Sequence, residues 1–256
     1  MKFREDQLQR YSRHLMLPEI DEQGQKKLLN ARVFMVGAGG LGSSAGYYLS
    51  AAGVGTLAII DDDEVELSNL QRQIAHNVKS VGAPKVESAK NTFESLNPDV
   101  HVVPLKTRLT NHNILGLIKD YDLVVDCSDN YATRFLVNDA CIILKKPLVT
   151  GAVFKFEGQL AVILPGESPC YRCFFDEQST GSLPSPQEAG ILGVVPGVIG
   201  ALQAAEVLKL ITGAGSPLKG ELLIYDALKP SFRKVKIPEN PACPTCGEST
   251  ITEPAA

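Results

Sequence analysis

A strand, a glycine-rich turn and a helix follow one another near the start of the chain, and this order restricts the fold more than any other feature. Residues 33–36 are apolar and typical of a buried strand. The turn and the start of the helix-like segment contain Gly37, Gly39, Gly40 and Gly42. Glycine permits a sharp turn and a close approach to a phosphate, and a helix N-terminus presents free N–H groups to the anion. The stretch therefore predicts a nucleotide-binding α/β unit.

A carboxylate at the end of the next strand strengthens this interpretation. The apolar run 57–60 ends at Asp61, which lies 19 residues past Gly42. This spacing suits a side chain that accepts hydrogen bonds from a ribose, so we expect an adenine nucleotide. The glycine turn and Asp61 alone would favour NAD. An NAD-dependent oxidoreductase therefore stays open as an alternative, which tight NADH binding without ATP binding would support.

Strand-like and helix-like segments alternate through the first 150 residues. We expect strands at 32–36, 57–60, 100–104, 123–126 and 147–150, with helices at 41–52, 84–96, 111–119 and 131–144. This alternation predicts right-handed crossovers and a doubly wound, mostly parallel, Rossmann-like sheet of the α/β class. Ligands of such sheets bind where strands end and helices begin.

The remaining segments extend this unit at both ends, and we expect a single domain over 1–256. Two short helices within 6–29 belong to an N-terminal part, 1–30, which precedes a nucleotide-binding half, 31–150. In the second half, 151–256, we expect an antiparallel extension from strands at 158–164, 221–226 and 232–237, and a long apolar helix at 197–211. Residues 176–190 show no periodicity and are predicted to form a surface loop.

Composition excludes several classes of protein. A hydrophobic content of 44% and a charged content of 21% are ordinary for a globular chain, and a net charge of −4 gives no support for a nucleic-acid or membrane-surface partner. The N-terminus is polar, without an apolar signal region. We find no segment that approaches the roughly 20 apolar residues needed to span a bilayer. The expected location is the cytoplasm.

Four of the six cysteines form two Cys-x-x-Cys pairs, Cys170 with Cys173 and Cys243 with Cys246. Two such pairs offer four thiolates to one tetrahedral Zn²⁺, which leaves no open coordination position and predicts a structural site. The alternative is that one pair is a redox dithiol, which needs no distant partner. The other two cysteines, at 127 and 141, are expected to be buried and structural. The four histidines show no metal-ligand spacing, and we assign them no role.

Basic residues after Asp61 favour a triphosphate over the pyrophosphate of NAD. Asn69 and Arg72 are three residues apart, so a helical turn points both in the same direction. Lys85 follows at the start of the next helix. Cations that converge on a glycine turn suit a chain of phosphates. The simpler alternative is that Arg72 and Lys85 are ordinary charged residues on the surface, solvated by water.

The end of the fourth strand offers oxygen ligands. Asp129 follows this strand, where a carboxylate is well placed to hold Mg²⁺ against phosphate oxygens, and Asp126 is expected to face the same crevice. An N-cap for the helix that starts near Tyr131 is the competing role for Asp129.

Five motifs now stand in order along the chain, namely Gly37–Gly42, Ser68–Gln73, Pro84-Lys85, Asp126–Asn130 and the two cysteine pairs. This combination resembles the MoeB/ThiF (HesA/MoeB/ThiF) family of bacterial E1-like enzymes, and the likeness runs nearly end to end. These enzymes adenylate ubiquitin-like sulfur carrier proteins. The resemblance implies that ATP and Mg²⁺ activate the carrier's C-terminal Gly-Gly carboxylate as an acyl-adenylate.

The resemblance also implies roles for individual residues. Gly40 and Asp61 would contact the nucleoside, Asn69, Arg72 and Lys85 the phosphates, and Asp129 the Mg²⁺. The family is typically a homodimer in which an N-terminal arginine, matched here by Arg13, reaches the neighbour's ATP. Residues 151–256 would bind the carrier, with its tail beneath the 176–190 loop. A carboxylate is already a nucleophile, so positioning and charge neutralisation suffice for this reaction without a general base.

One departure from the family concerns a loop cysteine that links covalently to the carrier in the thiamine branch. Pro186 stands at that position, and proline forms no thioester or acyl persulfide. Residues 153–159, 225–227 and 232–233 look more like the molybdopterin branch, in which a separate protein can deliver sulfur. A carrier of the thiamine type remains the alternative. A catalytically inactive, zinc-braced module that docks a carrier is a further alternative from another class.

Overall fold

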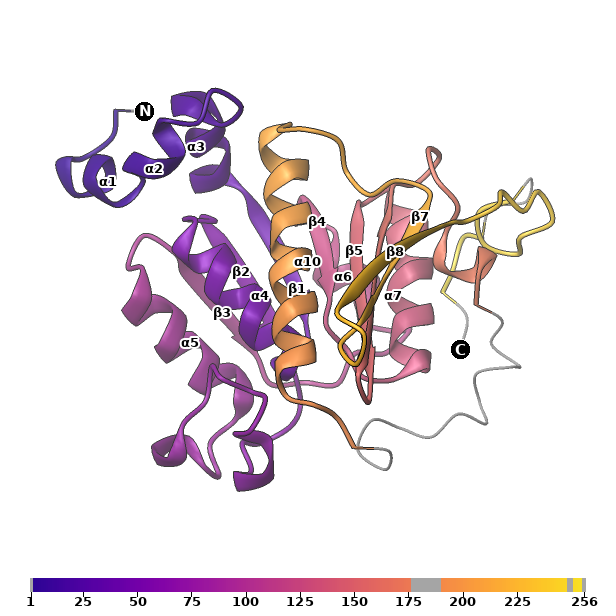
Figure 1. The fold of residues 1–256 in the computed structure, drawn as a ribbon, viewed down its shortest axis with the longest axis horizontal. Coiled ribbons are helices and arrows are strands. Elements are labelled where there is room, and N and C mark those ends of the chain that lie inside the picture. The colour runs from indigo at the N-terminus through magenta and orange to yellow at the C-terminus, as the bar shows by residue number, and fades with distance from the viewer. Residues whose placement is uncertain (1, 176–189, 248–250, 255–256) are drawn as a thin grey trace.

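The computed structural model describes residues 2–175, 190–247 and 251–254. Three short helices come first, α1 (Glu5–Arg10), α2 (Ser12–Leu15) and α3 (Asp21–Asn30), and they lie together at one end of the molecule (Figure 1). Leu28 of α3 is fully buried in the main hydrophobic core. The Lys27 ammonium donates a hydrogen bond to the carbonyl oxygen of Thr212 at 2.9 Å. These contacts attach the N-terminal segment to the rest of the fold.

One eight-stranded sheet runs through the molecule in the order β3-β2-β1-β4-β5-β6-β7-β8. Its first five strands are parallel, namely β1 (Arg32–Val36), β2 (Thr56–Ile60), β3 (His101–Leu105), β4 (Leu123–Asp126) and β5 (Leu148–Phe154). The strand order reverses between β1 and β4, where Val36 pairs with Asp126. In an open α/β sheet, a crevice forms at this reversal, outside the carboxyl ends of the strands.

The last three strands form the antiparallel extension, β6 (Glu157–Ile163), β7 (Glu221–Asp226) and β8 (Ser231–Lys236). In the described part of the chain, β3 and β8 are the two edges of the sheet. All six residues of β8 are exposed, whereas β1 is buried after its first residue. The extension therefore adds a partly solvated wing to a buried parallel core.

Helices cover both faces of the parallel part. The face with α4 (Gly40–Ala51), α5 (Lys85–Leu96) and α10 (Val194–Thr212) lies in front in Figure 1, and α6 (Ile114–Ile118) and α7 (Tyr131–Leu144) lie behind. Alternate residues of β1 enter different cores, with Val33 and Met35 on the first face and Phe34 and Val36 on the second. A sheet with a separate core on each face has the doubly wound architecture.

Helix α10 is long and apolar enough to cross a membrane by length and composition alone, contrary to the sequence-based expectation that no segment approaches this limit. It packs on α4 and on the sheet, however. A Cβ on Gly200 would lie 2.4 Å from the carbonyl oxygen of Leu41, so the two helices approach closely. Gln203 is fully buried and donates to the carbonyl oxygen of Asp126 at 2.7 Å. These contacts identify α10 as a core helix of the α/β fold.

The expected elements are present, with differences at their ends. The N-terminal segment forms three described helices rather than two, and α6 covers only five residues of the expected 111–119. Helix α10 begins at Val194 because Pro196 lies in its first turn, where its missing N–H has no intrahelical partner to lose. Strand β5 extends to Phe154 because it pairs along its full length with β6. The predicted surface loop 176–190 lies outside the described residues except for Gly190.

Candidate active site

The glycine turn leaves β1 with a backbone that only glycine adopts readily. Gly37 has a φ of 93°, and a Cβ there would lie 2.9 Å from the carbonyl oxygen of Cys127. A Cβ on Gly42 would lie 2.1 Å from the carbonyl oxygen of Gly37. Gly39 precedes the first residue of α4, so the unpaired N–H groups of the first helical turn face the crevice between β1 and β4. The turn is therefore built to receive an anion.

Asp61 follows β2 and braces this turn. Its Oδ2 accepts a hydrogen bond from the backbone N–H of Ala38 at 2.8 Å, and its Oδ1 accepts one from the N–H of Asp63 at 2.9 Å. Burial raises the pKa of the Asp61 carboxyl, and the nearby Lys85 charge opposes that shift. The carboxylate thus stands at the cavity wall with lone pairs left for a donor such as a ribose hydroxyl.

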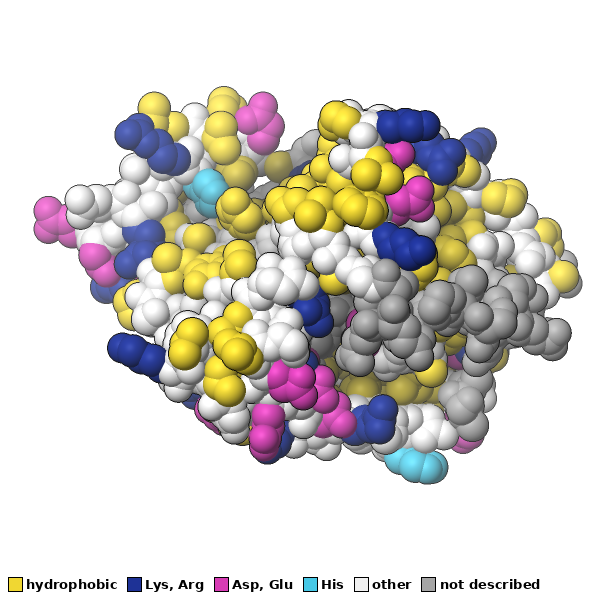
Figure 2. Space-filling view, turned by 60° about the horizontal axis from the view of Figure 1, so that its bottom comes forward, with side chains coloured by type: hydrophobic (Ala, Val, Ile, Leu, Met, Phe, Trp, Pro, Cys, Tyr) yellow, Lys and Arg dark blue, Asp and Glu magenta, His cyan; other side chains and the backbone are white. Residues whose placement is uncertain are grey.

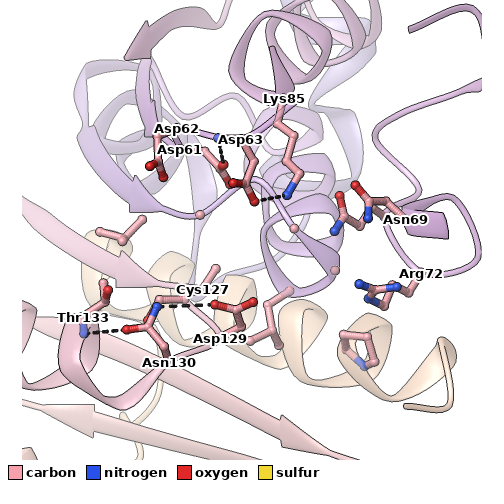
Figure 3. A pocket seen from close by; sticks show the side chains of 18 of the residues that line it. Asp61, Asp62, Asp63, Asn69, Arg72, Lys85, Cys127, Asp129, Asn130 and Thr133 are labelled. Carbon is pink, nitrogen blue, oxygen red and sulfur yellow. Dashed lines mark hydrogen bonds and ion pairs between the residues drawn. The ribbon is translucent and has the colours of Figure 1, made fainter. Parts of the chain in front are cut away.

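The segment after Asp61 forms a short 3₁₀-helix, η1 (Leu67–Asn69), that directs two side chains into the cavity. Asn69 is buried, and its Oδ1 accepts from the N–H of Glu66 at 3.1 Å. The backbone N–H of Arg72 donates to the carbonyl oxygen of Asn69 at 3.1 Å. Arg72 Nη1 donates to the carbonyl oxygen of Ser68 at 3.2 Å. Figure 3 shows Asn69 and Arg72 on the same wall of the cavity, as their spacing predicts.

Lys85 is the first residue of α5, and its side chain is only 8% exposed. Its ammonium forms an ion pair of 2.7 Å with Asp63, which is itself largely exposed. The backbone N–H of Lys85 also donates to the carbonyl oxygen of Asp63 at 3.0 Å. Two contacts with one residue hold the lysine at the cavity wall, where its charge is poorly screened by water.

The competing N-cap role that the sequence left open for Asp129 belongs to Asn130. Asn130 is the N-cap of α7, and its side-chain oxygen accepts from the N–H of Thr133 at 2.9 Å. Asp129 is exposed and accepts one long hydrogen bond of 3.4 Å from the Asn130 amide. Its carboxylate lies near the middle of the site in Figure 3, free to bind a cation.

Asp126 does not face the crevice, contrary to the sequence-based expectation. It is fully buried, accepting from the N–H of Ser128 at 3.0 Å and from the Thr150 hydroxyl at 2.9 Å. Burial raises the pKa of its carboxyl. Asp126 therefore supports the turn between β4 and α7 and has no oxygen directed into the cavity.

These elements enclose one cavity of about 730 Å³ at the reversal of the strand order. Eight of the predicted site residues line it, namely Gly37, Gly39, Gly40, Asp61, Asn69, Arg72, Lys85 and Asp129. Gly42 does not line it and instead permits the close packing of the turn. Arg13 is exposed on α2 and does not line the cavity, and its Nη1 lies 3.8 Å from the sulfur of Met16. Figure 2 shows one cluster of acidic side chains in the lower half of the face in view, and further acidic side chains at its left edge and in its upper half.

The sequence analysis missed several lining residues. Gln73 is 5% exposed, and its side-chain oxygen has no hydrogen-bond partner among the described residues. It belongs to the predicted 68–73 motif, so the motif itself was the available signal. Thr107, Arg108 and Leu109 follow β3 and also line the cavity. Their place at the carboxyl end of a parallel strand was the signal for them.

The four paired cysteines come together beside α7, and their sulfur atoms all lie within 4.8 Å of one another. The Sγ atoms of Cys170 and Cys243 lie 3.6 Å apart, and those of Cys173 and Cys246 lie 3.4 Å apart. Zn–S bonds of about 2.3 Å in a tetrahedron separate the sulfurs by about 3.8 Å. The four side chains therefore fit a tetrahedral metal ion. The two remaining cysteines, 127 and 141, are buried as expected.

Comparisons with known proteins agree with this geometry. A sulfur carrier protein adenylyltransferase of Thermus thermophilus is 49% identical over 97% of this chain and 94% of its own. A SAMP-activating enzyme E1 of Haloferax volcanii is 48% identical over 96% of this chain and 91% of its own. The solved structure of E. coli MccB with ATP has a TM-score of 0.78 and 25% identity, covering 88% of this chain and 68% of that chain.

The match to a family model covers most of the described fold. It runs from residue 11 to residue 245, from the N-terminal helices through the sheet to the second cysteine pair. The resemblance drawn from the five sequence motifs is thereby confirmed. The chain belongs to the ThiF family.

Proposed function

We propose that the chain uses ATP to adenylate the C-terminal Gly-Gly carboxylate of a ubiquitin-like sulfur carrier protein, releasing pyrophosphate. The observation that carries this proposal is the convergence of the glycine turn, Arg72 and Lys85 on one cavity, with Asp61 and Asp129 on its walls. The Thermus and Haloferax relatives, which are named as a sulfur carrier adenylyltransferase and a SAMP-activating E1, support the same substrate class.

The chemistry requires positioning more than proton transfer. The carrier's carboxylate attacks the α-phosphate, a P–O bond forms, and the bond to the pyrophosphate breaks. Because the nucleophile is already ionised, no base is needed, and no histidine lines the described part of the cavity. Arg72, Lys85 and the N–H groups of the turn reduce the repulsion between the two anions and align them. Asn69 would donate its amide to a phosphate oxygen, and Asp61 would accept from the ribose.

A magnesium ion fits the donor set of this site. Asp129 offers a carboxylate without a strong internal partner, and oxygen ligands are those that Mg²⁺ prefers. We propose that Asp129 holds it. When bound, the ion neutralises phosphate charge that the two cationic side chains leave uncompensated.

We assign the four cysteines, Cys170, Cys173, Cys243 and Cys246, to one structural Zn²⁺. Their sulfur separations suit a closed tetrahedral site, and all four positions are taken by protein ligands. The redox alternative needs only one pair, whereas here both pairs share one cluster. Zinc would brace the 151–256 half, to which we assign carrier binding within a single functional unit over 1–256.

A second copy of the chain completes the proposed site. The segment that carries Asn69 and Arg72 exposes large apolar side chains, namely Leu67 (69%), Ile74 (58%), Val78 (72%) and Val81 (46%). Such a group on one surface favours a protein interface. Arg13 is free of the cavity of its own chain, which supports its assignment to the ATP of the neighbouring copy.

Among carriers, we propose the small subunit of molybdopterin synthase, with a thiamine-type carrier as the alternative. The support is the sequence of residues 153–159, 225–227 and 232–233, and Pro186, which lies outside the described residues, excludes a thioester at that position. Sulfur would then come from a separate donor protein.

The decisive experiment is ATP–pyrophosphate exchange with Mg²⁺ and, separately, a molybdopterin-type and a thiamine-type carrier. Exchange that needs an intact Gly-Gly tail supports adenylation, and the faster carrier identifies the branch. Tight ATP binding without exchange on either carrier would favour the inactive docking module. Binding of NADH but not ATP would favour the oxidoreductase.

A further inference from the structure

His76, to which the sequence analysis gave no role, lies directly behind the glycine turn and is 6% exposed. Its Nε2 lies 2.9 Å from the carbonyl oxygen of Ala38, and its Nδ1 lies 2.9 Å from the Ser88 hydroxyl. A carbonyl oxygen only accepts, so Nε2 carries the proton and Nδ1 accepts from Ser88. Burial lowers the pKa of His76, the hydrogen bond to the Ala38 carbonyl opposes this shift, and the nearby Lys85 charge adds to the lowering. The net lowering of the pKa favours the neutral ring.

The two sides of Ala38 are held by different residues. Asp61 accepts from the N–H of Ala38, which belongs to the peptide group before it. His76 donates to the carbonyl of Ala38, which belongs to the peptide group that leads into Gly39. Together they fix the orientation of two successive peptide groups in the turn. Glycine neighbours leave those peptide groups free to rotate without such contacts.

Ser88 connects the same imidazole to the helix that carries Lys85. It lies three residues after Lys85, about one turn along α5. The imidazole therefore joins the glycine turn to α5 through a single rigid ring. Both of these elements contribute the groups that the proposed function assigns to the phosphates.

We propose that His76 is a positioning residue that fixes the glycine turn relative to Lys85, so that both act on one phosphate chain. This inference rests on the proposed nucleotide-binding function. The alternative is a core histidine whose hydrogen bonds are merely satisfied. The segment that contains His76 is also attached to α5 by a second hydrogen bond, because the Thr92 hydroxyl donates to the carbonyl oxygen of Ala75 at 2.7 Å. Loss of the imidazole thus leaves the local fold anchored.

Four variants separate these two interpretations. In H76Q the amide Nε2 can reach the position of the imidazole Nε2 and donate to Ala38. In H76N the shorter amide reaches only the Ser88 side, and H76L makes neither hydrogen bond. T92V is the matched control, since it removes a partly buried hydrogen bond from the same segment without contact to Ala38.

The measurement is the ratio of the dissociation constants for ATP and adenosine, together with melting temperature and the rate of exchange. Adenosine has no phosphate, so it lacks the contacts that the proposed function assigns to the N–H groups of the turn and to Lys85. We expect H76L and H76N to weaken ATP binding by about tenfold or more and to leave adenosine within about twofold, with a similar loss in kcat. H76Q restores most of the ATP preference, and T92V lowers the melting temperature with an unchanged ratio.

An unchanged ratio in H76L, or an equal change in T92V, would overturn the positioning role. Equal impairment of H76Q and H76L would also overturn it. These outcomes differ from failure of the proposed function, in which the wild-type chain itself binds ATP no better than adenosine or shows no carrier-dependent exchange.

Discussion

Arg172 and Asp139 form a buried two-point ion pair, in which the guanidinium Nε and Nη2 each lie 2.9 Å from a carboxylate oxygen. The Thr245 hydroxyl donates to the same carboxylate at 3.2 Å. Arg172 precedes the second cysteine of the first pair, and Thr245 precedes the second cysteine of the other. One side chain on α7 therefore holds both cysteine loops, so contacts within the protein itself bring the two loops together.

Removal of this carboxylate is expected to destabilise the fold strongly. D139A removes a bidentate ion pair with the mostly buried Arg172, and the loss of one member of a buried pair typically costs about 3–5 kcal/mol. E221A is the matched control, because Glu221 pairs with Lys234 on the surface at 3.1 Å and such pairs contribute about 1 kcal/mol or less. Urea unfolding measures both. Equal losses in the two variants would contradict the assignment.

The cysteine cluster should bind one zinc ion per chain. C243S should lose the metal and lower the melting temperature, whereas C141S, which alters a buried cysteine outside the cluster, should keep it. Because Asp139 orients both loops, D139A should also weaken zinc binding, by about 10- to 100-fold. Elemental analysis and competition with a chelator measure stoichiometry and affinity. Retention of zinc in C243S would exclude the four-thiolate site.

Lys85 should contribute to catalysis, whereas a nearby lysine should not. K85M removes a buried cation from the cavity wall, and loss of one preorganised charge commonly lowers kcat about 10²- to 10³-fold. Lys106 pairs with Glu64 at 2.9 Å on the surface and does not line the cavity. K106M should therefore stay within about twofold of the wild type. The measurement is the carrier-dependent exchange rate of K85M and of K106M relative to the wild type. Equal rates for K85M and the wild type would show that Lys85 has no part in catalysis.

Two glycines of α10 provide an internal comparison for helix packing. In G200A the new methyl group meets the backbone of α4, and the required shift should cost about 1–3 kcal/mol or more. In G197A nothing lies within 4 Å of the new methyl group, so the higher helix propensity of alanine should stabilise the chain by about 0.5–1 kcal/mol. Thermal unfolding gives the sign of each change. Stability changes of the same sign in G200A and G197A would show that the close approach of α4 and α10 does not determine the effect of a methyl group on α10.

The buried Asp126 carboxyl should make stability depend on pH. Burial raises its pKa in the folded chain above the unfolded value near 3.9, so the folded chain binds more protons between these two values. The free energy of unfolding therefore falls as pH rises through that range, and the loss persists at neutral pH. D126N has no such titration, and its amide can both accept from the Ser128 N–H and donate to the Thr150 oxygen.

The expected result is a difference in unfolding free energy between D126N and wild type that shifts in favour of the variant as the pH rises above the unfolded-state pKa near 3.9. Urea unfolding at several pH values measures it. A difference that is constant with pH would mean that the carboxyl keeps an ordinary pKa in the folded chain. Because the variant and the wild type are compared at each pH, titration of other groups cancels.

The parallel half of the fold was predictable because its signals are local. Each buried strand is a short apolar run, and the glycine turn and Asp61 fall at spacings set by the geometry of one crossover. Asn69 and Arg72 were placed together for the same reason, since a single turn of backbone relates them.

Relationships between distant segments were not predictable. The N-cap of α7 was offered to Asp129 as its competing role, and the backbone geometry gives it to the next residue, Asn130. Asp126 was assigned to the crevice because strand ends meet there, yet its side chain turns toward Thr150 on the adjacent strand. The contact of Asp139 with Thr245 spans 106 residues, and no sequence spacing encodes it.

The two edge strands of the described sheet, β3 and β8, also affect how readily the protein aggregates at high concentration. An edge strand presents unpaired N–H and C=O groups, which invite another chain to add a strand and grow an aggregate. On β3, Pro104 offers no N–H for such pairing. On β8, Arg233, Lys234 and Lys236 place like charges along the exposed edge, so two such edges repel. A chain that exposes apolar side chains such as Leu67 and Val78 thereby keeps its sheet from extending into fibres.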